Sequence, residues 1–414
     1  MGWFSLLFIG ALALDLALKF WLDARQRRSV LAHRGAVPAD FAGSISLDEH
    51  QKAADYTVAK LRAAGEDRLL RAALLLLYTL GGGIALLDGL FLRLFEQPLL
   101  VGVCTVLGLY VFDLLAWLPS SYRRTFGLEA RFGFNRSTRR TFLLDQLKVL
   151  ALTLVLGGAL SAAALWLMSA LGGLWWLGLW GMWLATLLLL IWAYPRFIAP
   201  IFNKMTPLDD AGLRGRIQAL LERCGFRSGG VFVMDGSRRS SHGNAYFGGL
   251  GRSKRIVFFD TLLQQLDGDE IEAVLAHELG HFRKRHQLVS LLVSGLFVLG
   301  ASALLGWLHG QPWFYAQLGV PRASDHAALL LMLQVAPVFF ALLSPLGNLL
   351  SRRNEFEADA FAAQHADAAK LAQGLIKLTR ENAGTLTPDP LYSAWHYSHP
   401  PVPERIARLQ PASA

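Results

Sequence analysis

The stretch VLAHELGHFRKRH, residues 274–286, places two histidines four residues apart, with a glutamate directly after the first. Just before it, Asp267 stands three residues ahead of Glu270, which is the pattern of a capping box at the start of a helix. Apolar residues then recur at the spacing of one helix face, at Ile271, Val274, Leu275 and Phe282. The stretch therefore predicts a helix that carries both histidines.

These histidines have the spacing of metal ligands. Residues four apart on a helix lie one turn above each other, so His277 and His281 can offer two nitrogens to one metal ion. Glu278 is rotated by about 100° from His277, where it can reach a water on the metal without being a ligand. This is the HExxH arrangement of zinc peptidases, and it predicts Glu278 as a general base.

A third ligand must come from elsewhere, because catalytic zinc commonly takes three protein ligands and leaves one position for water. The stretch SRRNEFEADAFA, residues 351–362, offers Glu355 and Asp359, which are again four apart and share a helix face, while Glu357 points away. One carboxylate as a ligand and a second that orients a histidine ring would meet the needs of a zinc site. The alternative is a solvated acidic start of a helix.

The C-terminal stretch WHYSHPPVPERIARL offers two further polar candidates. His399 precedes two prolines, which hold it in an extended conformation, and Arg405 lies one short turn into the helix that follows. Either side chain, if near the metal, would stabilise the oxyanion of a tetrahedral intermediate. The alternative is that both are surface residues.

The composition indicates a multi-pass membrane protein: 53% of the 414 residues are hydrophobic, 17% are charged and twelve are tryptophans. A membrane span needs about 20 mostly apolar residues. Seven stretches qualify, at residues 2–22, 71–93, 98–119, 148–169, 174–195, 287–308 and 327–348. The first has no basic start and no small-residue cleavage site, so we expect a retained span and not a removed signal peptide.

The basic residues test this topology. The net charge is +9, and the basic loops follow the first, third, fifth and seventh predicted spans, as DARQRR, YRRTFGLEARFGFNRSTRR, the segment ending in FRKRH, and SRR. All four lie on one side if the N-terminus is outside, so the positive-inside rule puts them in the cytoplasm. We therefore interpret the basic charge as membrane topology and expect no nucleic-acid partner.

Four regions follow from these assignments. Residues 1–199 hold spans one to five, 200–286 a soluble catalytic insertion, 287–350 spans six and seven, and 351–414 a C-terminal catalytic segment. Within the insertion, residues 208–226 predict a helix, and VFVMD, NAYFGG and RIVFFD predict short strands. Further helices are expected from residue 351, near 368–380 and after His399.

Some predicted spans contain charged residues, which are costly in a membrane. Asp15 and Lys19 are four apart in the first span, and Asp88 and Asp113 lie in the second and third. Two interpretations remain open here: a polar chamber between the helices, or a local ion pair together with residues near the span ends.

The motifs HELGH, RRNEFEADAFA, SSHGNAYFGG, IAPIFNKMTPL and HYSHPP, in register with seven spans, resemble those of the type I CAAX prenyl endopeptidases, a family of integral-membrane zinc metalloproteases. The resemblance implies a mainly α fold. Seven transmembrane helices would surround an intramembrane chamber, capped by a gluzincin-like zinc domain with a small β-sheet. It also implies one Zn²⁺ per chain, and a peptide or protein substrate whose C-terminus is prenylated.

The resemblance also assigns residues. It implies that Glu355 is the third zinc ligand and that Asp359 supports a zinc histidine. His399 and Arg405 match the family's C-terminal motif beside the active site. The segment of Asn244, Ala245 and Tyr246 matches the one that lines the family's cleft.

Two alternatives to this assignment were weighed. An HtpX-type quality-control protease shares the zinc chemistry, but the seven spans and the NAYFGG segment are closer to the CAAX enzymes. A channel, transporter or receptor with structural zinc would need a fourth ligand, and no cysteine is near. The Ala-, Leu- and Arg-rich composition favours a bacterial inner membrane, with damaged membrane proteins as substrates. In a eukaryote we expect the endoplasmic reticulum membrane.

Overall fold

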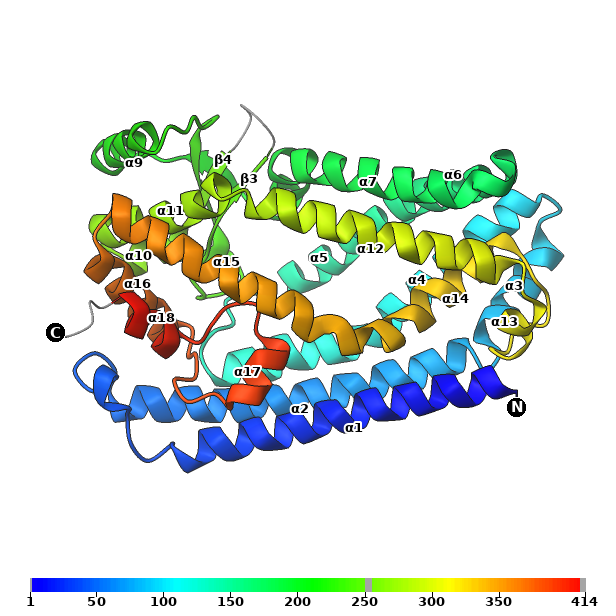
Figure 1. The fold of residues 1–414 in the computed structure, drawn as a ribbon, viewed down its shortest axis with the longest axis horizontal. Coiled ribbons are helices and arrows are strands. Elements are labelled where there is room, and N and C mark those ends of the chain that lie inside the picture. The colour runs from blue at the N-terminus through cyan, green and yellow to red at the C-terminus, as the bar shows by residue number, and fades with distance from the viewer. Residues whose placement is uncertain (1, 250–254, 410–414) are drawn as a thin grey trace.

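A computed structural model describes residues 2–249 and 255–409 and shows a mainly helical protein with one small β-sheet. Long helices run side by side along the longest axis of the molecule, and the sheet lies at one end of them (Figure 1). The N-terminus lies at the opposite end, beside α13 (Pro312–Ala316). The sheet therefore marks one end of a helical bundle.

The first half of the chain forms most of the bundle. Its helices are α1 (Trp3–Ala32), α2 (Leu47–Tyr78), α3 (Gly83–Leu94), α4 (Pro98–Arg123), α5 (Arg139–Leu152), α6 (Gly158–Ala170), α7 (Trp175–Ala193) and α8 (Ala199–Phe202). Short π-helical turns at Arg124–Glu129, Thr153–Gly157 and Tyr194–Ile198 extend α4, join α5 to α6, and join α7 to α8. These turns keep each rod continuous.

The second half forms the soluble part and the remaining rods. Its helices are α9 (Ala211–Arg223), α10 (Asp260–Gln265), α11 (Gly268–Arg283), α12 (His286–His309), α13, α14 (Asp325–Phe340), α15 (Ser344–His365), α16 (Ala368–Glu381), α17 (Pro390–His396) and α18 (Val402–Leu409). The helix expected within residues 208–226 and those expected near the C-terminus are confirmed. Helix α17 was not predicted, because its seven residues follow a proline-rich loop and carry no clear helical period.

The expected membrane spans are confirmed, with one change of shape. Within the described residues, six helical rods are long and apolar enough to cross a membrane, and α2 with α3 forms a seventh span bent by 51°. The prediction of one unbroken helix over residues 71–93 is wrong. Gly82 adopts a φ of 74°, which glycine tolerates and other residues rarely do, so the chain leaves the helix there.

The last span is longer than predicted. Residues Asp325–His365 form one rod in which a short turn, Ala341–Leu343, joins α14 to α15. Pro345, in the first turn of α15, has no N–H to donate, which accounts for the interruption. The rod carries the RRNEFEADAFA stretch from the membrane part directly into the soluble part.

The sheet has four strands in the order β1-β2-β4-β3: β1 (Met205–Pro207), β2 (Val231–Met234), β4 (Arg255–Phe259) and β3 (Ala245–Gly248). Strand β4 runs parallel to β2 and antiparallel to β3. The three predicted strands are confirmed, and β1 was missed because it is three residues long and ends in proline. Among the described residues β3 pairs only with β4, which makes it the last strand in that order.

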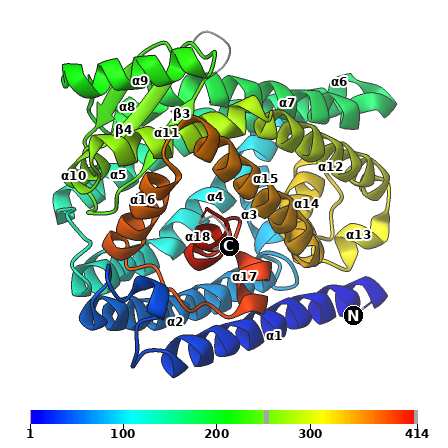
Figure 2. The same ribbon diagram turned by 60° about the vertical axis from the view of Figure 1, so that its left-hand side comes forward.

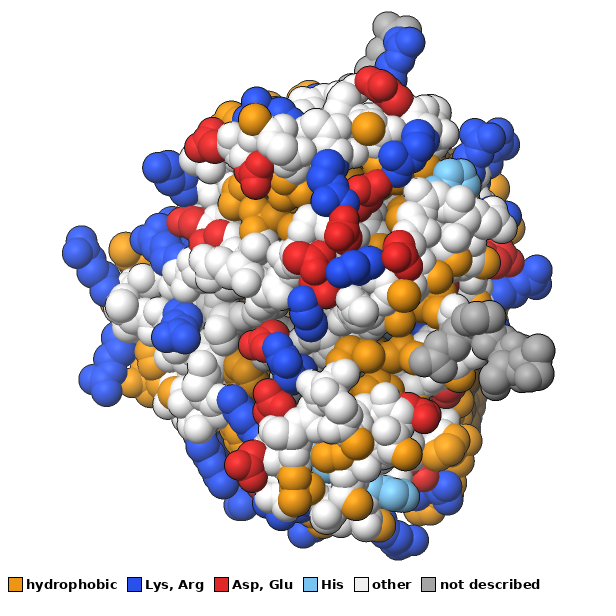
Figure 3. All heavy atoms as spheres, turned by 90° about the vertical axis from the view of Figure 1, so that its left-hand side faces the viewer, with side chains coloured by type: hydrophobic (Ala, Val, Ile, Leu, Met, Phe, Trp, Pro, Cys, Tyr) orange, Lys and Arg blue, Asp and Glu red, His pale blue; other side chains and the backbone are white. Residues whose placement is uncertain are grey.

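The sides of the rods and the end that carries the sheet differ in surface chemistry. Along the rods many leucines are exposed, among them Leu86, Leu296 and Leu349, as expected for helices that face lipid. Lys, Arg, Asp and Glu side chains are spread over the end that carries the sheet (Figure 3). This end therefore has the surface of a soluble domain.

In Figure 2 the helices are arranged around a central region. The structure also contains cavities of about 890, 770 and 540 Å³. Tyr194 lines both the second and the third cavity, and Arg239 and His242 line both the first and the third. The chamber expected from the resemblance is thus a series of cavities with common walls.

The charged residues within the spans fit both interpretations, since one forms a local ion pair and another lines a space between helices. Asp15 forms a local ion pair with Lys19 at 2.8 Å. Asp88 is buried and pairs with Arg322, also at 2.8 Å, from the segment before α14. Asp113 instead lines a cavity of about 210 Å³ between the helices.

Candidate metal centre

Helix α11 begins as predicted. The side chain of Asp267 accepts a hydrogen bond from the Glu270 N–H, and the Glu270 carboxylate accepts one from the Asp267 N–H, each at 2.9 Å. Ile271 and Leu275 are buried in the core of the soluble part, together with the side chains of α9 and the sheet. Val274 and Phe282, expected on the same buried stripe, are only partly buried and pack against this core.

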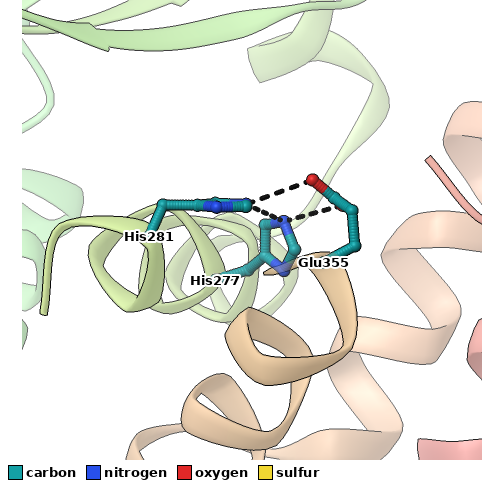
Figure 4. Close-up of side chains that lie close together, drawn as sticks. All are labelled: His277, His281 and Glu355. Atoms are coloured by element: carbon teal, nitrogen blue, oxygen red, sulfur yellow. Dashed lines mark hydrogen bonds and ion pairs between the residues drawn. The ribbon is translucent and has the colours of Figure 1, made fainter. Parts of the chain in front are cut away.

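Three side chains from two helices meet at one point (Figure 4). His277 and His281 of α11 place their Nε2 atoms 3.3 Å apart. Glu355 of α15 places Oε1 at 3.2 Å from His281 Nε2 and Oε2 at 3.4 Å from His277 Nε2. One ligand atom from each residue lies within 4.8 Å of the others, so the three predicted ligands are brought together.

A close approach of α15 to α11 makes this meeting possible. A Cβ atom on Gly280 would lie 3.0 Å from Cα and 3.1 Å from the carbonyl oxygen of Ala358. Contacts this short with backbone atoms cannot be relieved by a side-chain rotation. The glycine of HELGH therefore lets α15 come near enough to deliver Glu355.

The residues present fit a divalent cation. Among the described residues, Glu355 Oε2 is buried without a hydrogen bond of good geometry, and its ion-pair contacts are long, to His277 Nε2 at 3.4 Å and Arg405 Nη1 at 3.5 Å. An unsatisfied buried carboxylate oxygen is costly, and a cation would satisfy it. Two imidazole nitrogens and a carboxylate oxygen form a donor set that zinc binds readily, with a fourth position left open.

A buried pair lies behind His277. Asp359 Oδ1 is 2.8 Å from His277 Nδ1, and Arg405 binds both oxygens of Asp359, from Nε at 2.8 Å and from Nη2 at 2.6 Å. Asp359 and Arg405 are both buried. Arg405 also places Nη1 at 3.5 Å from Glu355 Oε2, and it does not line the cavity in front of the site, so a role at the oxyanion stays a prediction.

The carboxylates around His277 set its protonation in the metal-free site. Burial disfavours the imidazolium, but hydrogen bonds with Asp359 and Glu355 outweigh burial and the repulsion from Arg405, and raise the pKa of His277 to about 9. A proton is therefore held at the place where a cation would bind.

Two further residues, for which the sequence predicted no role, lie next to His281. His286 Nδ1 lies 3.0 Å from His281 Nδ1, and His286 Nε2 lies 3.2 Å from Glu357 Oε2. Glu357 faces away from the metal ligands, as expected, but it faces this second histidine. The available signal was a buried histidine at the first position of an otherwise apolar span.

The three ligands open onto the cavity of about 770 Å³. Its polar lining includes His277, Glu278, His281, His286, Glu355 and His399. Its walls include the β3 residues Tyr246, Phe247 and Gly248, the α7 residues Leu187, Leu190 and Ile191, and the α12 residues Ser290, Leu291 and Ser294. Glu278 thus lies beside the ligands and faces the open space.

The remaining candidate residues from the sequence lie in different parts of the site and its surroundings. His399 Nε2 is 3.2 Å from Glu355 Oε1, and its side chain is 64% exposed at the rim of the site. Tyr246 lines the cavity, and among the described residues its hydroxyl is buried without a hydrogen-bond partner. Asn244 instead lines the adjoining cavity of about 540 Å³, where it accepts a hydrogen bond from the Ala245 N–H, and Ala245 lines neither cavity.

Comparison with known proteins covers almost the whole chain. Residues 26–204 match the family model described as "CAAX prenyl protease N-terminal, five membrane helices", and residues 207–413 match "Peptidase family M48". The "CAAX prenyl protease 1 homolog" of Oryza sativa subsp. japonica is 37% identical over 320 residues, covering 77% of this chain and 75% of that protein. The chain belongs to the CAAX prenyl protease 1 family.

Other members of this family agree. The "CAAX prenyl protease 1" of Saccharomyces cerevisiae is 37% identical over 310 residues, covering 70% of this chain and 68% of that protein. The crystal structure of S. mikatae Ste24p matches 99% of each chain with a TM-score of 0.92 at 29% identity. The likeness confirms the expected fold: a multi-pass, mainly helical membrane protein with a small mixed sheet.

Membership in the CAAX prenyl protease 1 family also confirms the expected enzyme class. The second half of the chain is a metallopeptidase domain, so the protein cleaves peptide bonds in peptide or protein substrates. Neither alternative from the sequence analysis, an HtpX-type protease or a transporter with structural zinc, is favoured, because both halves of the chain match this family.

Proposed function

We propose that this protein binds one zinc ion through His277, His281 and Glu355 and cleaves peptides from the C-termini of prenylated CAAX-type proteins. The observation that carries the proposal is the convergence of the three ligand atoms within 4.8 Å at the floor of a cavity that also contains Glu278. The names of the relatives supply the substrate class.

Zinc, when bound, supplies a Lewis acid that polarises the scissile carbonyl and makes water more acidic. Glu278 follows His277 directly on α11 and faces the cavity. It accepts the proton of the attacking water and returns it to the nitrogen of the leaving amine. The chain therefore needs one carboxylate for both proton transfers.

Two side chains at the cavity can donate hydrogen bonds to the substrate. His399, at the rim beside Glu355, donates from its ring to the oxyanion that forms on the scissile carbonyl. Burial raises the pKa of Tyr246 to about 12, so its hydroxyl keeps its proton at neutral pH and can donate to the peptide. Neither role requires either residue to bind the metal.

The walls of the cavity suit an extended, lipid-modified peptide. Strand β3 is the last strand in the order of the described sheet and lines the cavity through Tyr246, Phe247 and Gly248, so a peptide can add beside it as a further strand. The opposite wall, from α7 and α12, is apolar at Leu187, Leu190, Ile191 and Leu291. Backbone pairing would hold the peptide, and this wall would accept an isoprenoid chain.

We also propose that the site faces the cytoplasm, in a bacterial inner membrane or, in a eukaryote, in the endoplasmic reticulum. The sheet and the loops that are rich in Lys and Arg lie at the same end of the bundle, and the positive-inside rule places that end in the cytoplasm. In this arrangement residues 1–199 and 287–350 form the membrane part. Residues 200–286 and 351–414 form the catalytic part, which α15 joins to the seventh span.

The test uses the purified full-length protein with matched peptides that differ only in a farnesyl group. We expect zinc-dependent cleavage that prefers the farnesylated peptide, and loss of cleavage with a chelator. Glu278→Gln should keep its zinc and lower kcat by about 10²- to 10⁴-fold. Glu222→Gln, on the exposed face of α9, is the matched control and should cleave as the wild type does. Equal hydrolysis by the wild type and Glu278→Gln would refute the proposal.

A further inference from the structure

We propose that His286 and Glu357 are positioning residues that hold His281 in the tautomer and orientation needed to bind zinc. The inference rests on the zinc site proposed above and adds two residues to it. It assigns a role to Glu357, the second acidic residue of the NEFEAD stretch, which the proposed chemistry leaves unused.

The hydrogen bonds can run in one consistent direction from the metal site to the carboxylate. A histidine that binds metal through Nε2 carries its proton on Nδ1. His281 Nδ1 would then donate to His286 Nδ1, 3.0 Å away, which leaves the His286 proton on Nε2. That nitrogen donates in turn to Glu357 Oε2 at 3.2 Å.

The relay ends on an anchored charge. Glu357 also accepts a hydrogen bond from Arg353 Nε at 3.1 Å, one turn earlier on α15. The Glu357 carboxylate thus favours a proton on Nε2 of His286, the nitrogen that faces it. The unprotonated Nδ1 of His286 then favours a proton on Nδ1 of His281, which leaves Nε2 of His281 unprotonated. A carboxylate that acts through a histidine in this way makes the ligand more basic and fixes its ring.

The geometry of α15 explains why a second histidine is needed. Successive residues on a helix are rotated by about 100°, so Glu357 is rotated by about 200° from Glu355 and cannot reach the metal ligands directly. Asp359, almost in line with Glu355, contacts His277 without an intermediate at 2.8 Å. The same helix therefore supports one histidine directly and the other through His286.

The backbone between α11 and α12 adopts an unusual conformation that places His286. Arg285 has φ 58° and ψ 28°, the left-handed region that non-glycine residues rarely occupy and that costs of the order of 1 kcal/mol. Directly after it, α12 begins at His286, whose ring lies 5.2 Å from that of His281 and is buried. The strained backbone at Arg285 thus brings the His286 ring against the His281 ring.

The experiment measures zinc binding by the intact purified protein, using equilibrium competition with a chelator of known affinity. His286→Phe removes the acceptor, His286→Asn keeps an acceptor near the Nδ1 position, and Glu357→Gln removes the charge. His365→Phe is the matched control, because His365 lies on α15 and its ring Nδ1 contacts the Phe361 carbonyl of the same helix at 2.9 Å. Peptide cleavage and thermal unfolding are measured for the same variants.

We expect His286→Phe to weaken zinc binding by about 10- to 100-fold, with kcat falling more than KM changes. His286→Asn and Glu357→Gln should each lose less zinc affinity than His286→Phe. The double variant of His286→Phe with Glu357→Gln should bind zinc no more weakly than His286→Phe alone, because the carboxylate acts through the ring. His365→Phe should bind zinc as the wild type does.

Two outcomes overturn the relay. One is a folded His286→Phe protein that holds zinc as tightly as the wild type. Should that variant fail to fold, the same result for both His286→Asn and Glu357→Gln overturns the relay. The other is a double variant whose loss equals the sum of the single losses. Both differ from failure of the proposed function, in which the wild-type protein itself would bind no zinc.

Discussion

Arg405 and Asp359 form a two-point ion pair that is buried behind the first metal-binding histidine. Both nitrogens of the contact lie within 2.8 Å of the carboxylate, whose Oδ1 is also 2.8 Å from His277 Nδ1. The C-terminal helix α18 thus reaches the metal centre from behind. Its arginine holds the carboxylate that contacts the ring of His277.

Breaking this pair should damage both the fold and the metal site. Arg405→Met leaves the Asp359 charge buried without its partner, and we expect a loss of about 3–5 kcal/mol in the free energy of unfolding and weaker zinc binding. Thermal unfolding and zinc content of the purified protein measure the two effects. Arg408→Met, on the same helix, lacks this contact and should change either quantity little. An Arg405→Met protein with normal zinc content would contradict the assignment.

The close approach of α15 to α11 gives a second prediction. Gly280→Ala places a methyl group 3.0 Å from the Ala358 Cα, so the helices must separate. We expect a destabilisation of about 1–3 kcal/mol and a loss of zinc affinity, because Glu355 moves away with α15. Gly300→Ala is the control, since nothing lies within 4 Å of its added Cβ. Equal zinc affinity of the two variants would show that the contact does not position Glu355.

Zinc binding should release a proton at neutral pH. The pKa of His277 in the metal-free protein is about 9, against 6.5 for an ordinary histidine. The stabilising effect of this proton is therefore complete below pH 6.5 and is lost as the pH rises through about 9. Because zinc must displace the proton, zinc affinity should increase with pH up to about 9.

Calorimetry in two buffers with different enthalpies of ionisation measures this release. The heat of zinc binding at pH 7 should differ between the buffers by about the difference in their enthalpies of ionisation, as expected when about one proton is released. Asp359→Asn removes the carboxylate that raises the His277 pKa, so its release should be smaller. Identical heats in the two buffers for the wild type would argue against a protonated His277.

His399 should affect the reaction and not the fold. Its side chain is 64% exposed and touches the site only through Glu355 at 3.2 Å. We expect His399→Ala to lower kcat by about 10²- to 10³-fold, with unchanged zinc content and thermal stability. His399→Gln, which keeps a donor, should recover part of the loss. A His399→Ala protein that loses zinc would show that His399 serves the metal and not the oxyanion.

The sequence by itself determined the parts that depend on neighbouring residues. Four-residue spacing puts His277 and His281 on one helix face, and Asp267 with Glu270 starts that helix, because both effects are settled within one or two turns of backbone. Long apolar stretches likewise fixed the spans. Where a local signal was overlooked, as at Gly82, the prediction failed and one span proved to be two helices joined at a bend.

Only the tertiary structure decided which distant groups meet. The sequence alone left Arg405 as either an oxyanion donor or a surface residue, and it predicted no partner for Glu357. Their contacts with Asp359 and His286 depend on how α18, α15 and α12 pack around α11, with distances set by residues far away in the chain. Helix periodicity fixes the direction of a side chain relative to its own axis, but the position of that axis is fixed by the packing of the whole bundle.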